Sequence, residues 1–302
     1  MGNKSNSIGE RMKNYYESVP KTKLVRRMPV VIRIDGKAFH TWTRGFNKPY
    51  DKVLSNAMVQ TMEQLCRNIQ GCVFGYTQSD EITLVLVDYN TIDTQAWFDY
   101  EVQKLCSVSA SMATMFFNKI FADEVQKYYT WLYINEYQIK DKFPKENKYL
   151  VSDNEKAVDL LGKYQPKVFT AMFDARCFNI PKEEVCNMLI WRQQDASRNS
   201  IEMLGRFYFS EKELFKKNTS EIQDMLMEKY GVNWNNVETR LKRGCACYKI
   251  EKAVNKRVNT SLNGEFSTTS NSGNIVSEWH IDDTIPIFTQ AREFVENHIL
   301  IY

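Results

Sequence analysis

The sequence predicts an α+β domain in which one antiparallel sheet is backed by two helices, the ferredoxin-like arrangement. Strand-like and helix-like segments follow one another in the order β-α-β-β-α-β, which is the order of the split βαβ fold. The composition, with 43% hydrophobic and 25% charged residues, is that of an ordinary globular chain. At 302 residues the chain is long enough for one large domain or two modest ones.

The first half of the chain supplies four of these elements. Residues 29–35 form a β-branched run that ends at Asp35 and is stopped by Gly36, which predicts a strand. Apolar residues recur at helical spacing over 52–69, and a glycine follows where a C-cap is typical. Residues 73–77 and 81–87 are strand-like and are separated by only three residues, so they predict a hairpin with Asp80 in its turn.

The second half completes the pattern. An amphipathic helix is expected over 96–121, a strand over 168–178 and a mostly helical segment over 181–209. Charged and amide residues dominate 140–167 and predict a surface insertion. Residues 260–277 are dense in Ser, Thr, Asn and Gly, which indicates a flexible loop before a helical tail at 288–299. We therefore expect a core over 1–139 and 168–250, an insertion over 140–167 and a C-terminal extension over 251–302.

Charge and cysteine content narrow the class of protein. Forty Lys and Arg residues against 37 Asp and Glu residues leave a net charge of +3, so a nucleic-acid site would have to be a local basic patch. Seven scattered cysteines without a signal peptide predict free thiols and a cytoplasmic location. The three histidines lack zinc-ligand spacing, and no apolar run is expected to span a membrane.

Two aspartates lie where the predicted sheet would bring them together. Asp35 ends the first strand and Asp80 lies in the hairpin turn, so both can reach the same edge of an antiparallel sheet. Like charges that close together raise each other's pKa, whereas one or two Mg²⁺ ions would use the same oxygens as ligands. Glu81 is expected on the opposite strand face and ranks below the aspartates. The alternative is that both aspartates are ordinary turn residues.

Positive charge surrounds Asp35 in the sequence. The basic residues nearby are Arg33, Lys37, His40, Arg44 and Lys48. Such a loop beside an acidic metal site is typical of enzymes that bind a nucleoside triphosphate. Alternatively, the lysines are solvated surface residues and His40 packs beside Phe39.

Two other segments contain candidate binding residues. Lys104 lies on the predicted helix, from which it would reach a phosphate or simply face solvent. A cluster of polar residues interrupts the apolar pattern of 191–201 and indicates a ligand or RNA contact; it consists of Arg192, Asp195, Arg198 and Asn199.

Several motifs together resemble the tRNA-histidine guanylyltransferase superfamily. In order, they are RIDGKAFH at 33–40, KPYD at 48–51, SDE at 79–81, FDARCFNIP at 173–181 and WRQQD at 191–195. The resemblance extends from about residue 7 to about residue 249. It implies a polymerase-like palm fold and an enzyme that adds nucleotides to the 5′ end of tRNA, in the 3′ to 5′ direction. By family likeness it also implies a homo-oligomer, a tetramer.

The resemblance further implies roles for individual residues. Two Mg²⁺ ions would be held by Asp35, the carbonyl of Gly36 and Asp80, so that Asp35, Asp80 and the adjacent Glu81 are the expected catalytic residues. ATP and GTP, or other nucleoside triphosphates, would be bound by Arg33, Asp35, Gly36, Lys37, Ala38, Phe39, His40, Lys48, Asp51, Ser79, Asp80 and Lys104. The tRNA would be contacted by Arg176, Arg192, Arg198 and Asn199.

The implied chemistry needs no side-chain nucleophile. ATP first adenylylates the 5′ monophosphate of the tRNA, and the 3′ hydroxyl of a nucleotide then displaces AMP; both steps are phosphoryl displacements. The same palm and aspartates would serve a nucleotidyl cyclase or an ordinary 5′ to 3′ polymerase, and a non-catalytic tRNA-binding protein is a further alternative.

Two departures from the family pattern refine the expectation. Eukaryotic members carry a longer asparagine-rich motif where this chain has ASRNSI at 196–201. The chain is similar instead to the bacterial, archaeal and phage branch, whose implied task is template-dependent repair of truncated tRNA 5′ ends. Glu101 stands where the family tends to carry arginine, three residues before Lys104.

Overall fold

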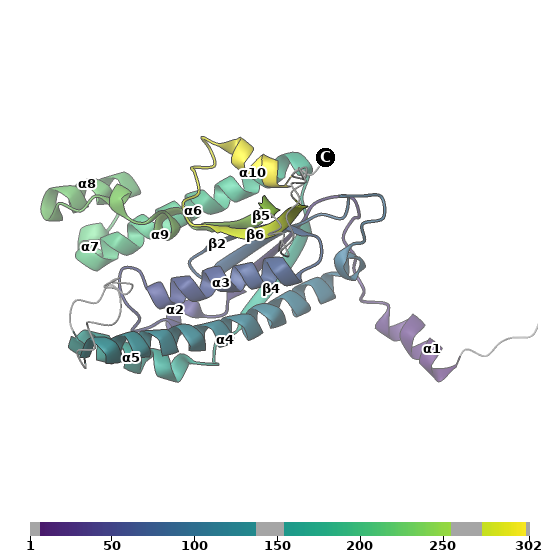
Figure 1. Cartoon of the computed structure of the whole chain (residues 1–302), viewed down its shortest axis with the longest axis horizontal. Coiled ribbons are helices and arrows are strands. Elements are labelled where there is room, and N and C mark those ends of the chain that lie inside the picture. Colours follow the sequence, from purple (N-terminus) through teal and green to yellow (C-terminus); the bar gives the residue numbers. More distant parts are fainter. Residues whose placement is uncertain (1–6, 137–153, 255–273, 300–302) are drawn as a thin grey trace, which may run out of the picture.

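The computed structural model describes residues 7–136, 154–254 and 274–299. It shows an antiparallel six-stranded sheet with helices on both faces, which confirms the predicted α+β class (Figure 1). The strand order is β4-β1-β3-β2-β5-β6. The strands are β1 (Val30–Gly36), β2 (Cys72–Gln78), β3 (Glu81–Leu86), β4 (Phe173–Asn179), β5 (Cys245–Val254) and β6 (Asn274–Asp282).

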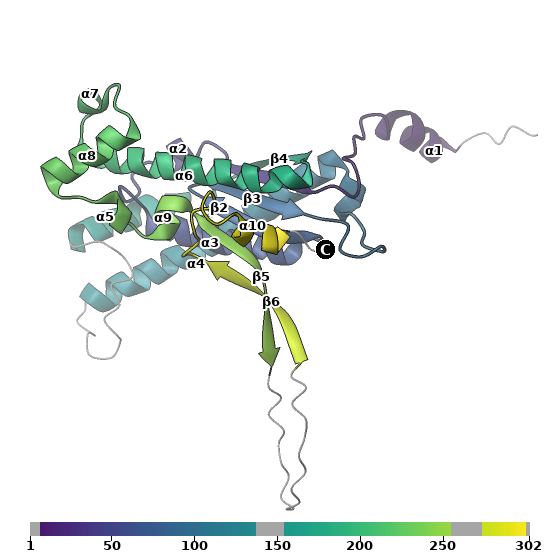
Figure 2. The ribbon, with the colours of Figure 1, turned by 90° about the horizontal axis from the view of Figure 1, so that it is seen from above.

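Two hydrophobic cores separate the sheet from its helices. Helices α3 (Lys52–Asn68), α4 (Val102–Glu136) and α5 (Asn154–Tyr164) cover one face, and α6 (Val185–Tyr208) and α10 (Arg292–Ile299) cover the other (Figures 1 and 2). The order β1-α3-β2-β3-α4-β4 is the predicted one. Alternate residues of β1 enter the core under α3 and α4, so Arg33 and Asp35 lie on the α6 side of the sheet.

The shorter elements gather at the two ends of the molecule. A small third core joins the end of α6 to α8 through Leu204, Ile222 and Leu226. Helix α1 projects from the other end (Figure 1). The short elements are α1 (Ile8–Met12), η1 (Lys13–Glu17), α2 (Phe39–Trp42), η2 (Trp97–Tyr100), η3 (Gln165–Lys167), η4 (Lys182–Glu184), α7 (Glu211–Leu214), α8 (Thr219–Tyr230), η5 (Trp234–Asn236) and α9 (Thr239–Arg243).

The charged insertion expected over 140–167 is not all surface. Its second part forms α5 and η3, and the first part, up to residue 153, lies outside the described residues. Helix α5 packs on α4 through Ala157, Leu160, Leu161 and Tyr164, all buried in the main core. The many Lys and Asp residues conceal this helix because only one of its faces is apolar, and that face is short.

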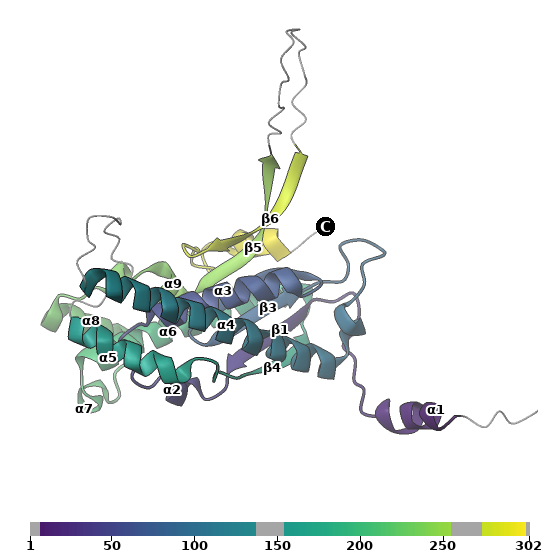
Figure 3. The same ribbon diagram turned by 60° about the horizontal axis from the view of Figure 1, so that its bottom comes forward.

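The last residues of the loop expected near the C-terminus belong to a strand. Strand β6 begins at Asn274 and pairs with β5 in register from Ala246↔Asp282 to Val254↔Asn274. The loop prediction is therefore wrong for 274–277, and its remainder lies outside the described residues. The β5–β6 hairpin extends the sheet and projects from the body (Figures 2 and 3). The final helix, α10, begins at Arg292, later than the expected residue 288.

Helix α4 is much longer than the expected helix. Its stretch 102–134 is long and apolar enough, by length and composition, to cross a membrane, contrary to the expectation that no such run exists. Here it serves as a core helix, because Leu105, Ala113, Phe117 and Phe121 are buried against the sheet and α3. Its apolar length follows from packing against β4, β1, α3 and α5 at once.

Candidate active site

The two predicted aspartates meet at one end of the sheet. The amide of Gly36, which follows Asp35, donates a hydrogen bond of 3.0 Å to the backbone carbonyl of Asp80. Strands β2 and β3 are joined by a two-residue turn in which Ser79 has a positive φ of 50°. This tight turn keeps Asp80 beside the end of β1, so the predicted convergence is confirmed.

Negative charge accumulates at this point. Burial raises the pKa of the Asp35 carboxyl, and the neighbouring charges of Asp80, Glu81 and Asp174 raise it further. Burial also raises the pKa of Asp80, although a hydrogen bond from Ser79 opposes the rise. In the described part of the chain, no Lys or Arg nitrogen lies within 4.0 Å of either carboxylate of this pair. A cation supplied from outside would relieve this repulsion.

The residues present suit a Mg²⁺ ion that is coordinated by the protein and by the substrate together. Within residues 7–136, 154–254 and 274–299, no group of three His, Cys, Asp or Glu side chains is placed to hold a metal alone. Asp35, Asp80 and backbone carbonyls are hard oxygen donors, and Mg²⁺ commonly binds one or two carboxylates plus substrate phosphates and water. The donor set therefore suits a metal that arrives with a nucleotide.

Gly36 is required by the loop that follows it. A Cβ atom at this position would lie 2.4 Å from the ring of Phe39, which is buried against Trp42, Phe117 and Phe173. The chain then turns through Ala38, whose φ is 55°, while the amide of Lys37 donates to the carbonyl of Met172. Phe39 therefore anchors the loop in the core and leaves His40 exposed beside the site.

Glu81 is held by an arginine. It pairs directly with Asp35 in the β1–β3 register, so both side chains lie on the α6 face, contrary to the expectation of opposite faces. Arg192 of α6 donates from Nε and Nη2 to the two carboxylate oxygens of Glu81 at 2.7 and 2.9 Å, and also contacts Asp195. Arg192 is buried, so its assignment as a tRNA contact is wrong: its charge neutralises Glu81.

A cavity of about 680 Å³ opens beside the aspartates. One wall is formed by His40, Lys48 and the cis peptide bond to Pro49, and the floor by Ser79 and Asp80. The opposite wall comes from α6; it consists of Asn199, Glu202, Met203, Arg206 and Phe207. A volume of several hundred Å³ is typical of small-molecule sites, and this one combines an apolar lining with cationic side chains at its rim.

Asp51, at the end of the KPYD motif, is a structural residue as well as part of this lining. Its carboxylate accepts hydrogen bonds from the amides of Leu54 and Asn47 at 2.8 and 2.9 Å and from the hydroxyl of Tyr164 at 2.6 Å. It is the N-cap of α3. Burial raises its pKa against these bonds. The carboxylate has little capacity left for a nucleotide.

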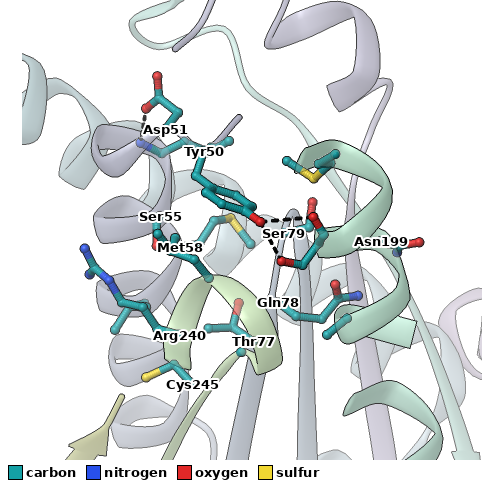
Figure 4. A pocket seen from close by; sticks show the side chains of 17 residues that line it. Tyr50, Asp51, Ser55, Met58, Thr77, Gln78, Ser79, Asn199, Arg240 and Cys245 are labelled. Atoms are coloured by element: carbon teal, nitrogen blue, oxygen red, sulfur yellow. Dashed lines mark hydrogen bonds between the residues drawn. The ribbon is translucent and has the colours of Figure 1, made fainter. Parts of the chain in front are cut away.

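A second, smaller cavity of about 100 Å³ adjoins the first (Figure 4). Both cavities are lined by Asp51, Leu54, Ser79, Asn199 and Met203. In the small cavity the hydroxyl of Tyr50 contacts the backbone carbonyl and hydroxyl of Ser200 at 3.0 and 2.8 Å. This bond ties the KPYD segment to α6 and so fixes the width of the larger cavity.

Lys104 is not brought to the site within one chain. It lies in the first turn of α4, where its Nζ is 5.6 Å from the ring centroid of Phe98. The neighbouring Glu101 is buried and pairs by backbone with Lys23, which precedes the start of β1. Asp35 lies at the other end of β1. The predicted contact from Lys104 to a nucleotide at Asp35 is therefore wrong for a single chain.

The other predicted cations lie on the rim. Arg33 faces α6, with its Nε 4.0 Å from Glu81, and Arg176 on the edge strand β4 is exposed and 3.4 Å from Asp174. Arg198 is exposed and paired with Asp195, while Asn199 lines both cavities. These positions leave Arg176 and Arg198 accessible to a large substrate.

Sequence reasoning missed part of the α6 wall. Met203, Arg206 and Phe207 line the large cavity because they follow Asn199 on the same side of one helix. The helical period of α6 could have found them, starting from Asn199. Tyr164 could not have been found in this way, because its bond to Asp51 links residues 113 positions apart.

Comparisons with known proteins agree with this geometry. The sequence model of the family described as tRNAHis guanylyltransferase matches residues 9–181, more than half of the chain. A probable tRNA(His) guanylyltransferase of Dictyostelium discoideum is 23% identical over 274 residues, which cover 86% of this chain and 87% of that protein.

Solved structures of a bacterial tRNA(His) guanylyltransferase-like protein are also similar. The complex with ATP is 35% identical, with a TM-score of 0.71, and the match covers 98% of this chain and 100% of that one. The complex with GTP is 33% identical, with a TM-score of 0.66, and the match covers 97% and 99%. The likeness therefore includes the C-terminal strands as well as the residues that the family match spans.

Proposed function

Because the chain belongs to the tRNAHis guanylyltransferase family and is a nucleotidyltransferase, we propose that it adds nucleotides to the 5′ end of tRNA in the 3′ to 5′ direction. The observation that carries this proposal is the meeting of Asp35 and Asp80, joined by the hydrogen bond from Gly36 to the Asp80 carbonyl, next to a cavity of nucleotide size. Family membership supports the reaction class, and this geometry supports a reaction centre at Asp35 and Asp80.

Mg²⁺ is the metal that we propose for this site. Asp35, the carbonyl of Gly36 and Asp80 would hold it, in one or two ions, and it would supply charge stabilisation to the attacking and leaving oxygens of a phosphoryl displacement. Two features support the choice: the raised pKa of both carboxyls, which for Asp35 prevails over the opposing charge of Arg176, and the absence, among the described residues, of a Lys or Arg nitrogen within 4.0 Å of either one.

The chain's own residues position the nucleotides. Lys48 lines the cavity close to Asp80 and is suited to a triphosphate, and His40 lies at the same wall. ATP would transfer its AMP to the 5′ phosphate of the RNA with release of pyrophosphate. The 3′ hydroxyl of the incoming nucleotide would then attack that phosphate, forming the new bond and releasing AMP. The complexes of the bacterial relative with ATP and with GTP support such use.

We further propose that selection of the incoming nucleotide follows a template. The segment ASRNSI at 196–201 lies in the wall of the smaller cavity, through Ala196, Asn199 and Ser200, and Asn199 also lines the larger one; the eukaryotic pattern here is longer and rich in asparagine. A small apolar pocket discriminates poorly between similar bases, so base pairing with the opposite strand of the acceptor stem is the better source of selectivity. Template-directed addition of this kind would repair truncated tRNA 5′ ends.

A single assay tests the reaction class. A tRNA that lacks its first nucleotide and carries a 5′ monophosphate is incubated with the protein, Mg²⁺, ATP and the four nucleoside triphosphates, and both RNA ends are mapped. We expect extension at the 5′ end only. Extension at the 3′ end would indicate an ordinary polymerase, a cyclic nucleotide formed without RNA would indicate a cyclase, and an unchanged RNA would indicate a binding protein.

The cytoplasmic location and the homo-oligomer remain part of the proposal. A tetramer would give each site access to residues of a second chain, and Lys104, remote from Asp35 in its own chain, is one residue that such an arrangement could use. Sedimentation measurements would establish the oligomeric state.

A further inference from the structure

Three large exposed side chains lie along one side of α6, and the last of them, Arg206, also lines the large cavity. Trp191 is 51% exposed, and the side chains of Arg198 and Arg206 are 60% and 66% exposed. Their spacings of seven and eight residues keep them on one side of a helix with 3.6 residues per turn. At 1.5 Å per residue the line is about 22 Å long, which matches three to four nucleotides of extended RNA.

Trp191 is held in place from the sheet side. The guanidinium carbon of Arg192 is 4.5 Å from the centre of the indole ring, and that of Arg33 is 5.5 Å away. Both arginines also pair with the carboxylate of Glu81, at 4.0 Å for Arg33 and 2.7 Å for Arg192, which restrains them beside the ring. Trp191 nevertheless keeps half of its surface exposed. The indole is therefore a restrained aromatic surface that is partly open to solvent.

This surface lies close to the proposed reaction centre. Arg33 is two residues from Asp35 on the same strand face, a separation of about 7 Å. Trp191 does not line the cavity that contains Lys48 and Asp80. A nucleotide bound in that cavity would thus leave the indole free for a different part of the substrate.

We propose that Trp191 stacks on an unpaired base of the RNA substrate and that Arg198 and Arg206 bind the phosphates that follow it. The inference rests on the proposed function and deepens it, by assigning a binding surface for the single-stranded part of the RNA. Aromatic side chains that stack bases, with cations along the backbone, are the usual means of binding single-stranded nucleic acid.

The existing ion pairs do not prevent this. Arg198 pairs with Asp195, and Arg206 with Glu202, four residues away on the same helix. Exposed pairs of this kind contribute little, whereas a phosphate offers an arginine a stronger, bidentate partner. Both arginines can therefore exchange a carboxylate for a phosphate at small cost.

Stacking is tested by RNA binding at equilibrium, without nucleotides. The probes are two fluorescein-labelled RNA hairpins with the same stem, one with a four-nucleotide 3′ overhang and one blunt. Replacing an aromatic side chain that stacks on a base by alanine typically costs about 1–3 kcal/mol of binding free energy. Trp191→Ala should therefore weaken binding of the overhang RNA by about 5-fold to 150-fold and leave the affinity for the blunt RNA unchanged. Trp191→Phe should retain most of the affinity.

Tyr129→Ala is the matched control, because Tyr129 is 46% exposed on α4, on the other face of the sheet. It should bind both hairpins as the wild type does. An overhang affinity within two-fold of wild type in Trp191→Ala would overturn the proposal, as would an equal loss for the blunt hairpin. Unchanged melting temperatures of the variants exclude misfolding as the cause.

The arginines are tested through salt. Arg206→Gln should reduce the slope of log affinity against log salt for the overhang RNA by about 0.7, the value for one phosphate on a single strand. Arg67→Gln is the control, since Arg67 on α3 forms the same type of helical pair, with Glu63. Equal slopes for wild type and Arg206→Gln would contradict the phosphate contact.

These outcomes are independent of the proposed reaction. A protein that binds the overhang through Trp191 but adds nothing to tRNA 5′ ends would refute the proposed function and leave this inference standing. One that extends 5′ ends normally, with Trp191→Ala unaffected in RNA binding, would refute this inference alone.

Discussion

The backbone amide of Gly36 donates a 3.0 Å hydrogen bond to the carbonyl of Asp80, and this bond holds Asp35 and Asp80 together at one end of the sheet. Each carboxylate is thereby placed beside a like charge. Because these strands also pack in the hydrophobic cores, the fold holds the two like charges together even without a cation. We therefore expect these two residues to lower the stability of the metal-free protein and to be needed for activity.

Asp35→Asn and Asp80→Asn should each lower nucleotide addition by at least about 100-fold, since even the outer partners of metal ligands typically contribute 10–100-fold. The same variants should bind Mg²⁺ more weakly. Melting temperatures with and without Mg²⁺ check this directly: the ion should stabilise the wild type and have little effect on either variant. Equal stabilisation of all three proteins would contradict the assignment of the metal ligands.

The pH dependence of stability has a defined sign. The folded-state pKa of Asp35 and of Asp80 is raised, so the folded protein binds more protons than the unfolded chain between the ordinary value near 4 and the higher folded values. Without metal, the wild type should therefore lose stability relative to Asp35→Asn as the pH rises through that window. Thermal melting in EDTA at pH 4 and pH 7 measures it. A difference that shrinks toward pH 7 would contradict the account.

Arg192→Ala should destabilise the protein by about 3–5 kcal/mol, because it leaves Glu81 buried without its partner. Arg206→Ala, which removes an exposed pair with Glu202, should cost less than about 1 kcal/mol. Urea unfolding of both variants tests the contrast. A similar loss of unfolding free energy in the two variants would show that the buried pair with Glu81 contributes no more to stability than the exposed pair.

Gly36→Ala should destabilise by about 1–3 kcal/mol, the usual cost of overpacking, since its Cβ would meet the ring of Phe39. Gly162→Ala is a matched control in α5, where an added Cβ meets nothing within 4 Å. It should stabilise by about 0.5–1 kcal/mol through helix propensity. Chemical unfolding distinguishes the two, and a neutral Gly36→Ala would show that the loop can move away from Phe39.

Asp51→Ala should cost at least about 1 kcal/mol, because it removes the cap of α3 together with the bond to Tyr164. Asp51→Asn keeps an oxygen for the amide of Leu54 and removes a charge that burial disfavours, so it should cost less. If Asn proves as costly as Ala in urea unfolding, the negative charge itself is what the site needs.

Local patterns were sufficient to predict the central part of the fold. The β-branched run at 29–35 and the tight turn at 79–80 together predict where Asp35 and Asp80 meet, since both features depend on near neighbours in sequence. The same logic predicted the order of the strands and helices from β1 to β4. The basic residues around Asp35 and the polar cluster in 191–201 also indicated a binding site, and Lys48 and Asn199 from these two groups line the cavity.

Contacts between distant parts of the chain could not be predicted. Nothing local indicates that Arg192 reaches Glu81, 111 residues away, or that Tyr164 reaches Asp51. The strand at 274–277, Asn-Ile-Val-Ser, was concealed because it directly follows a stretch dense in Ser, Thr, Asn and Gly, and its pairing with β5 at the edge of the sheet is not visible in the local sequence. Lys104 was misplaced because helical spacing gives the face of α4 but not which end of the sheet its first turn adjoins.

The central claim is that this site extends the 5′ end of tRNA under the direction of a template. The most direct measurement uses tRNAs that lack the first nucleotide and carry C, A, G or U at the opposing position of the 3′ strand, each incubated with Mg²⁺, ATP and all four nucleoside triphosphates. The account predicts that the nucleotide found at the new 5′ end changes each time to the Watson–Crick partner, and that Asp80→Asn adds none. Addition of G to all four tRNAs would contradict the templated reaction and indicate a dedicated guanylyltransferase.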